Sequence, residues 1–324
     1  MRGRLLRRML HAAVGDKELE RARDFYARLR THPRLALAFA RAAATSALRD
    51  IDPTRPSTWE FTGFSQNGED GIIDYLCGRL LTSNRYFIEI GASDGLENNT
   101  SWLALGRRYG GLMIDGDPSK VAYCERVFKR LNWALDFASL LVTRETVGDV
   151  GRLALLKNPD VFSLDIDSID YYVAAALLAQ GFRPKIFVVE YNSVFGPDRC
   201  VTVEYNETFN RHRYHPTGFY YGASVSALRH LFHKHGYEFV TVERNGFNAF
   251  FADPAEFDAG FLDAIRGEMY CENILHRRES RTTWREQYEH IHHLPLIDVS
   301  ASTAMTSDVP AAAVVRMGRA GLAS

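Results

Sequence analysis

The chain has 324 residues, of which 46% are hydrophobic and 24% charged, and its formal net charge is -1. This composition is typical of a folded globular protein, and it argues against a nucleic-acid-binding protein that depends on overall positive charge. The cysteines form no C-x-x-C pair, so we expect neither a zinc ribbon nor a disulfide scaffold. No apolar run is long enough to span a membrane, and we therefore expect a cytoplasmic protein.

Residues 1–58 are predicted to form a helical extension and a linker. The stretches 17–30 and 34–50 space apolar side chains by three and four positions, as amphipathic helices do. Their many arginines suit contact with an anionic membrane surface or a partner protein; the alternative is a solvated extension packed on the main domain. Pro53 and Pro56 mark the linker.

Residues 59–294 are predicted to form one α/β domain. Short apolar runs that favour strands alternate with helical stretches, which indicates a parallel sheet covered on both faces, a doubly wound Rossmann-like fold. The predicted strands lie within residues 85–93, 110–117, 160–167 and 184–192 and, with weaker boundaries, 133–143.

The end of the predicted sheet changes character. Two β-favouring runs in residues 237–252 are joined at Asn245-Gly246, and this dipeptide favours a hairpin because both residues tolerate positive φ. A mostly parallel sheet that ends in an antiparallel hairpin resembles that of class I methyltransferases. Residues 295–324 are small and weakly patterned, and we predict that they form a disordered tail.

The main functional signal is the turn after the first predicted strand, Glu89–Gly95. A strand that leads into a glycine-rich turn brings backbone amides close to a ligand, and Gly91 and Gly95 lack the Cβ atoms that would block that approach. The spacing is E-x-G-x-x-x-G rather than the G-x-G-x-x-G of dinucleotide sites. Asp94 would repel a pyrophosphate but suits the ammonium group of a sulfonium cofactor that carries an amino acid.

Asp115 lies at the end of the next predicted strand. An acid at this position typically accepts hydrogen bonds from ribose hydroxyls, and Asp117 is the fallback for the same role. The glycine turn and the acid together predict a nucleoside-containing cofactor.

Several sequence blocks resemble the FkbM-type methyltransferases over roughly residues 63–252: SQNGEDGII, FIEIGASDGLENN, GLMIDGDPS, FSLDIDSIDYYV, IFVVEYN and YYGAS. The resemblance implies a class I fold and methyl transfer from S-adenosylmethionine to hydroxyls, often on sugars or natural products. It also implies that Gln66 and Glu69 line the mouth of the cofactor site, where the alternative is that they cap the helix 68–81. Asp115 stands where many relatives carry glutamate, a difference that keeps the hydrogen-bond acceptor.

Acidic and amide side chains end two neighbouring predicted strands: Asp165, Asp167 and Asp170 follow one, and Glu190 and Asn192 the next. In doubly wound folds, ligands bind beyond these strand ends. Asp165, Asp167, Glu190 and Asn192 could hold Mg²⁺ or another divalent cation, an arrangement that resembles catechol-type O-methyltransferases. The alternatives are a metal-free site with Asp167 or a histidine as general base, and acids that only cap the next helix.

Residues 204–224 are rich in histidine, tyrosine, asparagine and arginine, as acceptor-binding insertions commonly are. His212 and His215 are candidate bases, and Tyr220 and Tyr221 could stack on an acceptor; for both histidines the alternative is an exposed loop position. The other histidines show no convincing metal-ligand spacing: His230, His233, His235, His290, His292 and His293.

The sequence therefore predicts an S-adenosylmethionine-dependent methyltransferase that most resembles O-methyltransferases of a sugar, glycan or polyol hydroxyl, with a small molecule or glycan as acceptor. Two alternatives stay open: a non-catalytic relative that keeps the fold and binds the cofactor, and a nicotinamide-dependent sugar oxidoreductase. The missing G-x-G-x-x-G and the terminal hairpin disfavour the oxidoreductase.

Overall fold

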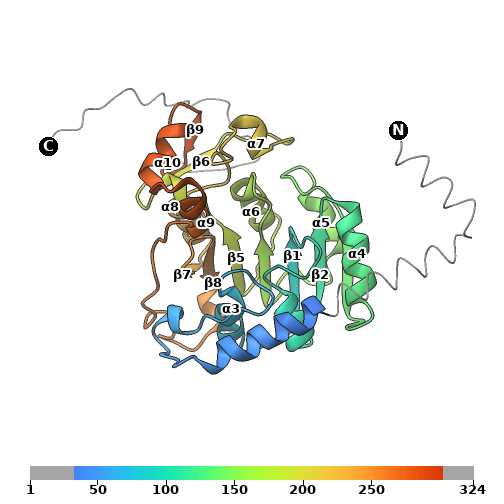
Figure 1. Cartoon of the computed structure of the whole chain (residues 1–324). Helices are drawn as coiled ribbons and strands as arrows, with labels where there is room; N and C mark the ends of the chain where they lie inside the picture. The colour runs from blue at the N-terminus through green and yellow to red at the C-terminus, as the bar shows by residue number, and fades with distance from the viewer. Residues whose placement is uncertain (1–32, 302–324) are drawn as a thin grey trace, which may run out of the picture.

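The computed structural model describes residues 33–301, which are built around one seven-stranded sheet of order β3-β2-β1-β4-β5-β8-β7 (Figure 1). Neighbouring strands pair in parallel except at β8, which is antiparallel to both β5 and β7. The strands are β1 Tyr86–Ile90, β2 Gly110–Asp115, β3 Leu135–Ser139, β4 Val161–Leu164, β5 Ile186–Glu190, β7 Glu238–Val242 and β8 Asn248–Ala252.

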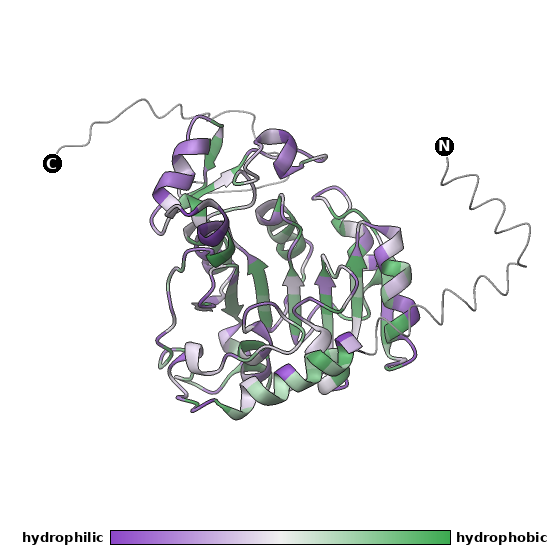
Figure 2. Ribbon diagram, in the orientation of Figure 1, coloured by the Kyte–Doolittle hydropathy of each residue, from purple (hydrophilic) through white to green (hydrophobic). Residues whose placement is uncertain are grey.

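Helices cover both faces of this sheet. They are α3 Glu69–Cys77, α4 Pro118–Phe128, α5 Val147–Leu153, α6 Asp170–Ala179 and α8 Val225–Lys234. Because side chains alternate along a strand, Ile88 packs against α5, α6 and α8, whereas its neighbour Phe87 packs with α3 and α4. Figure 2 shows the central strands as mostly hydrophobic, as expected for strands buried on both faces.

The predicted strands and the terminal hairpin are confirmed. Residues 243–247 join β7 to β8, and Gly246 has a φ of 79°, the left-handed conformation that an Asn-Gly turn uses. The strand order reverses between β1 and β4, which sets a topological switch point at their carboxyl ends. The fold is the doubly wound, Rossmann-like class I methyltransferase fold, with a mostly parallel sheet and one antiparallel strand.

A small second layer lies above the carboxyl ends of the strands (Figure 1). It contains β6 Val201–Val203, paired with β9 Leu296–Asp298, and the helices α7 Arg211–Tyr214, α9 Ile274–Ser280 and α10 Trp284–Ile291. Because β9 pairs with β6, the ordered domain continues past residue 295, where the sequence analysis began the tail. The rest of that predicted tail lies outside the described residues.

Residues 33–47 are helical, as predicted, and lie against the main domain. Leu35, Ala38 and Ala42 are buried, and the guanidinium of Arg41 donates a hydrogen bond of 2.7 Å to the carbonyl of Gly63. The predicted helix at 17–30 lies outside the described residues. Within residues 33–301, no helix combines the length and the apolar character needed to cross a membrane.

Candidate functional site

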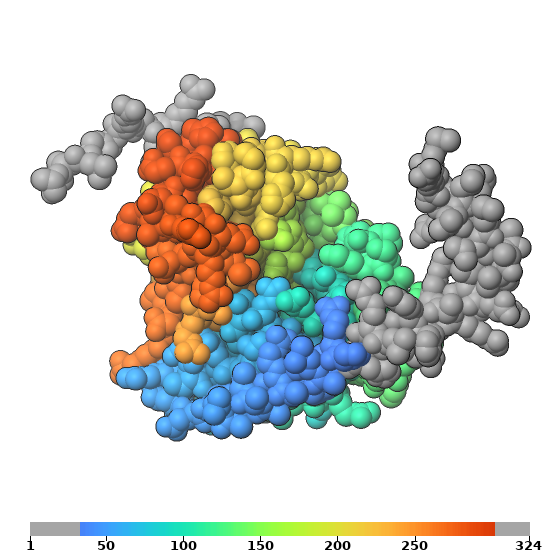
Figure 3. Space-filling view, viewed as in Figure 1, coloured from blue at the N-terminus to red at the C-terminus, as the bar shows by residue number. Residues whose placement is uncertain are grey.

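A cavity of about 800 Å³ opens at the carboxyl ends of β1, β2 and β4. Its walls include residues of the glycine turn, the ends of β2 and β4, and the segment 207–213. In Figure 3 this last segment (yellow) and the residue 33–47 helix (blue) lie on opposite sides of the cyan and green surface of the domain. The cavity therefore lies at the topological switch point, where ligands of doubly wound folds bind.

The glycine turn closes tightly on the neighbouring strand. Gly91 has a φ of 90°, and a Cβ atom at this position would lie 1.6 Å from the carbonyl oxygen of Asp165. Only glycine fits here. The prediction that the turn presents its amides to a ligand needs correction, because the amides of Gly91 and Ala92 donate to the carbonyl of Ile114 and that of Ser93 donates to Asp115.

Asp115 ends β2 and lines the cavity. Its carboxylate accepts hydrogen bonds of 2.8 Å from the amides of Ser93 and Asp117. A carboxylate can accept about four hydrogen bonds, so Asp115 keeps acceptor capacity toward the cavity. Asp117 instead caps α4 by accepting from the amide of Ser119, and it does not line the cavity.

Asp94 lines the cavity but already has a cationic partner. Its carboxylate lies 2.7 Å from the guanidinium of Arg34, which comes from the residue 33–47 helix. The ammonium-binding role predicted for Asp94 must therefore compete with Arg34. Gly95 does not line the cavity; a Cβ there would meet the side chains of Cys124 and Phe128, so this glycine lets the turn pack on α4.

Glu89 is buried and serves the turn rather than the main cavity. Its carboxylate accepts from the amide of Asn99 at 2.9 Å and from the hydroxyl of Thr100, and burial raises the pKa of Glu89 to about 7. Glu89 and Glu69 line a separate polar cavity of about 60 Å³, which Gln66 joins while also lining the main cavity.

Glu69 is the first residue of α3 and is buried. Its carboxylate accepts from the amides of Asn67 and Gly68 and from the side chain of Asn248. These bonds hold the loop before α3 and the start of that helix against β8, so Glu69 has a structural role even though it does not cap the helix amides.

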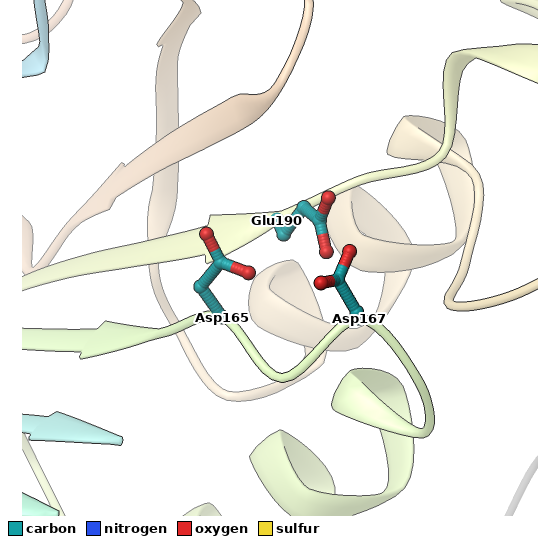
Figure 4. Close-up of side chains that lie close together, drawn as sticks. All are labelled: Asp165, Asp167 and Glu190. Atoms are coloured by element: carbon teal, nitrogen blue, oxygen red, sulfur yellow. The ribbon is translucent and has the colours of Figure 1, made fainter. Parts of the chain in front are cut away.

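The carboxyl ends of β4 and β5 bring three acids together. Oxygen atoms of Asp165, Asp167 and Glu190 lie within 4.8 Å of one another, and Figure 4 shows the three side chains converging. Burial, followed by repulsion from neighbouring carboxylates, raises the pKa of Asp165 and of Glu190 well above their usual values. One buried oxygen of Glu190, Oε2, has no hydrogen-bond partner within the described chain. We call these residues the carboxylate cluster.

Arg211 is the cation that faces the carboxylate cluster, and the sequence analysis did not select it. Its guanidinium lies 2.5 Å from Asp167 and 5.0 Å from the ring centroid of Tyr221. The only signal in the sequence was the basic run Arg211–Arg213, which does not reveal which acid it meets.

Asn192 is not available as a metal ligand, contrary to the prediction. Its side chain is fully buried, donates to the carbonyls of Phe219 and Tyr221, and accepts from the amide of Val194. The amide therefore fixes the loop before α8. Asp170 is the first residue of α6 and accepts from the amides of Ile166 and Ser168, so it fixes the loop between β4 and α6 rather than capping the helix amides.

The two candidate histidines separate in the structure. His212 is exposed and lines the cavity, whereas His215 does not line it. The ring of His215 instead lies 6.1 Å from that of His293, and burial lowers its pKa. Tyr220 and Tyr221 are buried rather than offered to an acceptor; the Tyr220 hydroxyl donates to the carbonyl of Pro295.

No protein-family model matches the sequence, and neither does any curated protein. Among solved structures, a CurJ carbon methyltransferase matches with a TM-score of 0.40 and 12% identity, over 65% of this chain and 57% of that chain. A methyltransferase from Thiobacillus denitrificans in complex with S-adenosyl-L-homocysteine matches with a TM-score of 0.34 and 14% identity, over 60% and 69%. A TehB-like methyltransferase from Corynebacterium glutamicum matches with a TM-score of 0.33 and 13% identity, over 58% and 88%.

Proposed function

We propose that this chain is an S-adenosylmethionine-dependent methyltransferase. One observation carries the proposal: a single cavity at the topological switch point joins the glycine turn and Asp115 to two members of the carboxylate cluster, Asp165 and Asp167. The glycine turn and Asp115 suit a nucleoside, and the carboxylate cluster suits an acceptor from which a proton must be removed.

The residues of the cavity fit the cofactor. Asp115 has free acceptor capacity for ribose hydroxyls, and Leu140, Leu141 and Val142 offer an apolar wall for a purine. Leu141 is 65% exposed, which suits a side chain that a ligand covers. A cavity of about 800 Å³ is within the range of small-molecule sites and leaves room for part of an acceptor.

S-adenosylmethionine supplies a methyl group that its sulfonium already activates. The tasks left to the chain are to align the acceptor for in-line attack and to take up its proton. We propose that the acceptor is a hydroxyl of a sugar, glycan or related polyol, which several carboxylates can orient at once. Asp167 takes the proton, because it is the exposed member of the cluster and lines the cavity.

A divalent cation such as Mg²⁺ is the second candidate for this step. The observation that favours it is the buried oxygen of Glu190 without a partner, beside two further carboxylates within 4.8 Å. Oxygen donors are the ligands that Mg²⁺ prefers, and Asp165, Asp167 and Glu190 would hold it. The ion would lower the pKa of a bound hydroxyl.

Calorimetry with S-adenosylmethionine and, separately, with NAD tests the cofactor assignment. We expect the chain to bind S-adenosylmethionine and not NAD. Binding of NAD alone would favour the sugar oxidoreductase. A comparison of extracts from cells with and without the gene, searched for products heavier by one CH₂ group, then identifies the acceptor, and cofactor binding without any such product would indicate the non-catalytic relative.

A further inference from the structure

Arg211 reaches the carboxylate cluster from a separate part of the chain. It begins α7, a helix of one turn, whereas the three acids follow β4 and β5. Its side chain is 28% exposed, and that of Asp167 is 56% exposed. This ion pair therefore lies at the edge of the cavity, where either side chain has room to move.

Arg211 does not complete the carboxylate cluster. Its ion pair is with Asp167, whereas the Oε2 atom of Glu190, a residue that is 6% exposed, has no partner in the described part of the chain. One guanidinium contributes a single positive charge against three carboxyl groups, and a divalent cation would contribute two. Figure 4 shows the three carboxyl groups close together, so a small ion between them could take one oxygen from each residue.

We propose that Arg211 and a divalent cation compete for the carboxylate cluster. Binding of the cation displaces the guanidinium of Arg211 from Asp167, and the α7 segment moves away from the end of β4. Without the cation, Arg211 covers Asp167 and holds it in an ion pair at the edge of the cavity.

This exchange rests on the proposed function of the carboxylate cluster in binding the acceptor. It makes Arg211 a positioning residue that couples cation binding to access of the acceptor. The segment that moves is short: Asn210 caps α7 by accepting from the amide of His212, and Phe209 stacks on Tyr214 with ring centroids 4.6 Å apart. The same two rings also pack on the buried ring of Tyr220, with centroids 6.0 and 5.4 Å away, so the movement of α7 is a local shift of one turn that stays attached to the domain.

Titration of the full chain with Mn²⁺ in the absence of S-adenosylmethionine, followed by electron paramagnetic resonance, tests the exchange. Removal of the competing charge by Arg211→Met should tighten Mn²⁺ binding about tenfold, which is the factor that corresponds to a competitor covering the site about 90% of the time. Glu190→Gln should abolish binding. Arg213→Met, on the same turn of helix, is the matched control and should leave the affinity unchanged.

Trypsin provides a second readout that does not depend on the stability of a variant. In the unsubstituted chain, Mn²⁺ should accelerate cleavage after Arg211 and Arg213, and Asp167→Asn should abolish that acceleration. Equal or weaker Mn²⁺ binding by Arg211→Met, or cleavage that Mn²⁺ does not change, would overturn the exchange. Loss of S-adenosylmethionine binding alongside intact Mn²⁺ binding would instead overturn only the methyltransferase proposal.

Discussion

The glycine turn after β1 and the carboxylate cluster after β4 and β5 both contribute residues to the main cavity, Gly91 from the turn and Asp165 and Asp167 from the cluster, but they differ in how many of their polar groups have partners. The polar groups of the turn find partners inside the protein: its amides donate to Ile114 and Asp115, and Glu89 accepts from Asn99 and Thr100. The cluster concentrates negative charge and leaves an oxygen of Glu190 unpaired.

This difference separates two ways of building a binding site. A rigid, internally bonded turn loses little conformational entropy when a ligand binds, so it suits a cofactor that binds in one orientation. An electrostatically incomplete cluster stores unfavourable energy that a cation, a proton or a hydroxyl can relieve, so it suits the step in which charge changes. Substitutions in the two regions should therefore affect stability in opposite directions.

Gly91→Ala should have the largest effect on stability. The new Cβ would meet the backbone of Asp165 at 1.6 Å in a left-handed conformation, and we expect a loss of about 3 kcal/mol or more in the free energy of unfolding. Urea denaturation measures this loss. The matched control is Gly148→Ala in α5, where the nearest atom is 3.9 Å away and a gain of about 0.5–1 kcal/mol is expected. Equal stability of the two variants would show that the turn is not rigid.

The buried acid of the turn should give a pH dependence. The pKa of Glu89 in the folded chain is about 7, above the ordinary glutamate value of 4.5, so the folded state holds its proton more tightly. This tighter proton binding stabilises the folded state. Its contribution to the free energy of unfolding, up to about 3 kcal/mol, is fully present below pH 4.5 and is lost as the pH rises through 7. Glu89→Gln should remove this part of the pH dependence between pH 5 and 8, as measured by denaturation at each pH. Parallel curves for the two proteins would contradict the assignment.

Asp115→Ala should weaken S-adenosylmethionine binding about 10- to 100-fold, because acceptors for the ribose hydroxyls are lost. Asp117→Ala is the matched control: it removes the cap of α4 and should cost about 1 kcal/mol of stability while leaving the affinity unchanged. Calorimetry measures both affinities. A greater loss of affinity in Asp117→Ala than in Asp115→Ala would show that Asp117, rather than Asp115, binds the ribose.

Glu190→Gln should stabilise the chain by about 1 kcal/mol while lowering methyl transfer, since it removes a buried carboxyl group whose ionisation is opposed by burial and by its neighbours and which only function requires. Asp160→Asn is the contrasting control, because Asp160 is buried 3.0 Å from Lys185 and its loss leaves that buried cation with only the more distant Glu256, at 3.7 Å. Thermal unfolding should move up for the first variant and down for the second. A lower unfolding temperature for Glu190→Gln would show that the cluster is not strained.

The strand and hairpin pattern was predictable from the sequence because it depends on local apolar periodicity and on the Asn245-Gly246 turn. The grouping of Asp165, Asp167 and Glu190 was also predictable, because parallel strands carry their carboxyl ends to one edge. The role of Arg211 was not predictable, since its contact with Asp167 spans 44 positions in the sequence and depends on the path of an irregular segment.

Two further features depend on contacts that sequence patterns do not encode. Asn192 was expected to face the ligand, but its amide bonds to loop carbonyls that come from residues 27 and 29 positions later in the chain. The short strand β9 forms only because β6 is available to pair with it, across almost a hundred residues of sequence. Tertiary pairing of this kind has no local signature.

The most direct test of the account is a crystal structure of the chain with S-adenosylhomocysteine. We predict electron density for the ligand in the main cavity, with the ribose hydroxyls within hydrogen-bonding distance of the Asp115 carboxylate and the purine against Leu141. A cavity that stays empty at saturating ligand, or a ligand bound away from Asp115, would contradict the account.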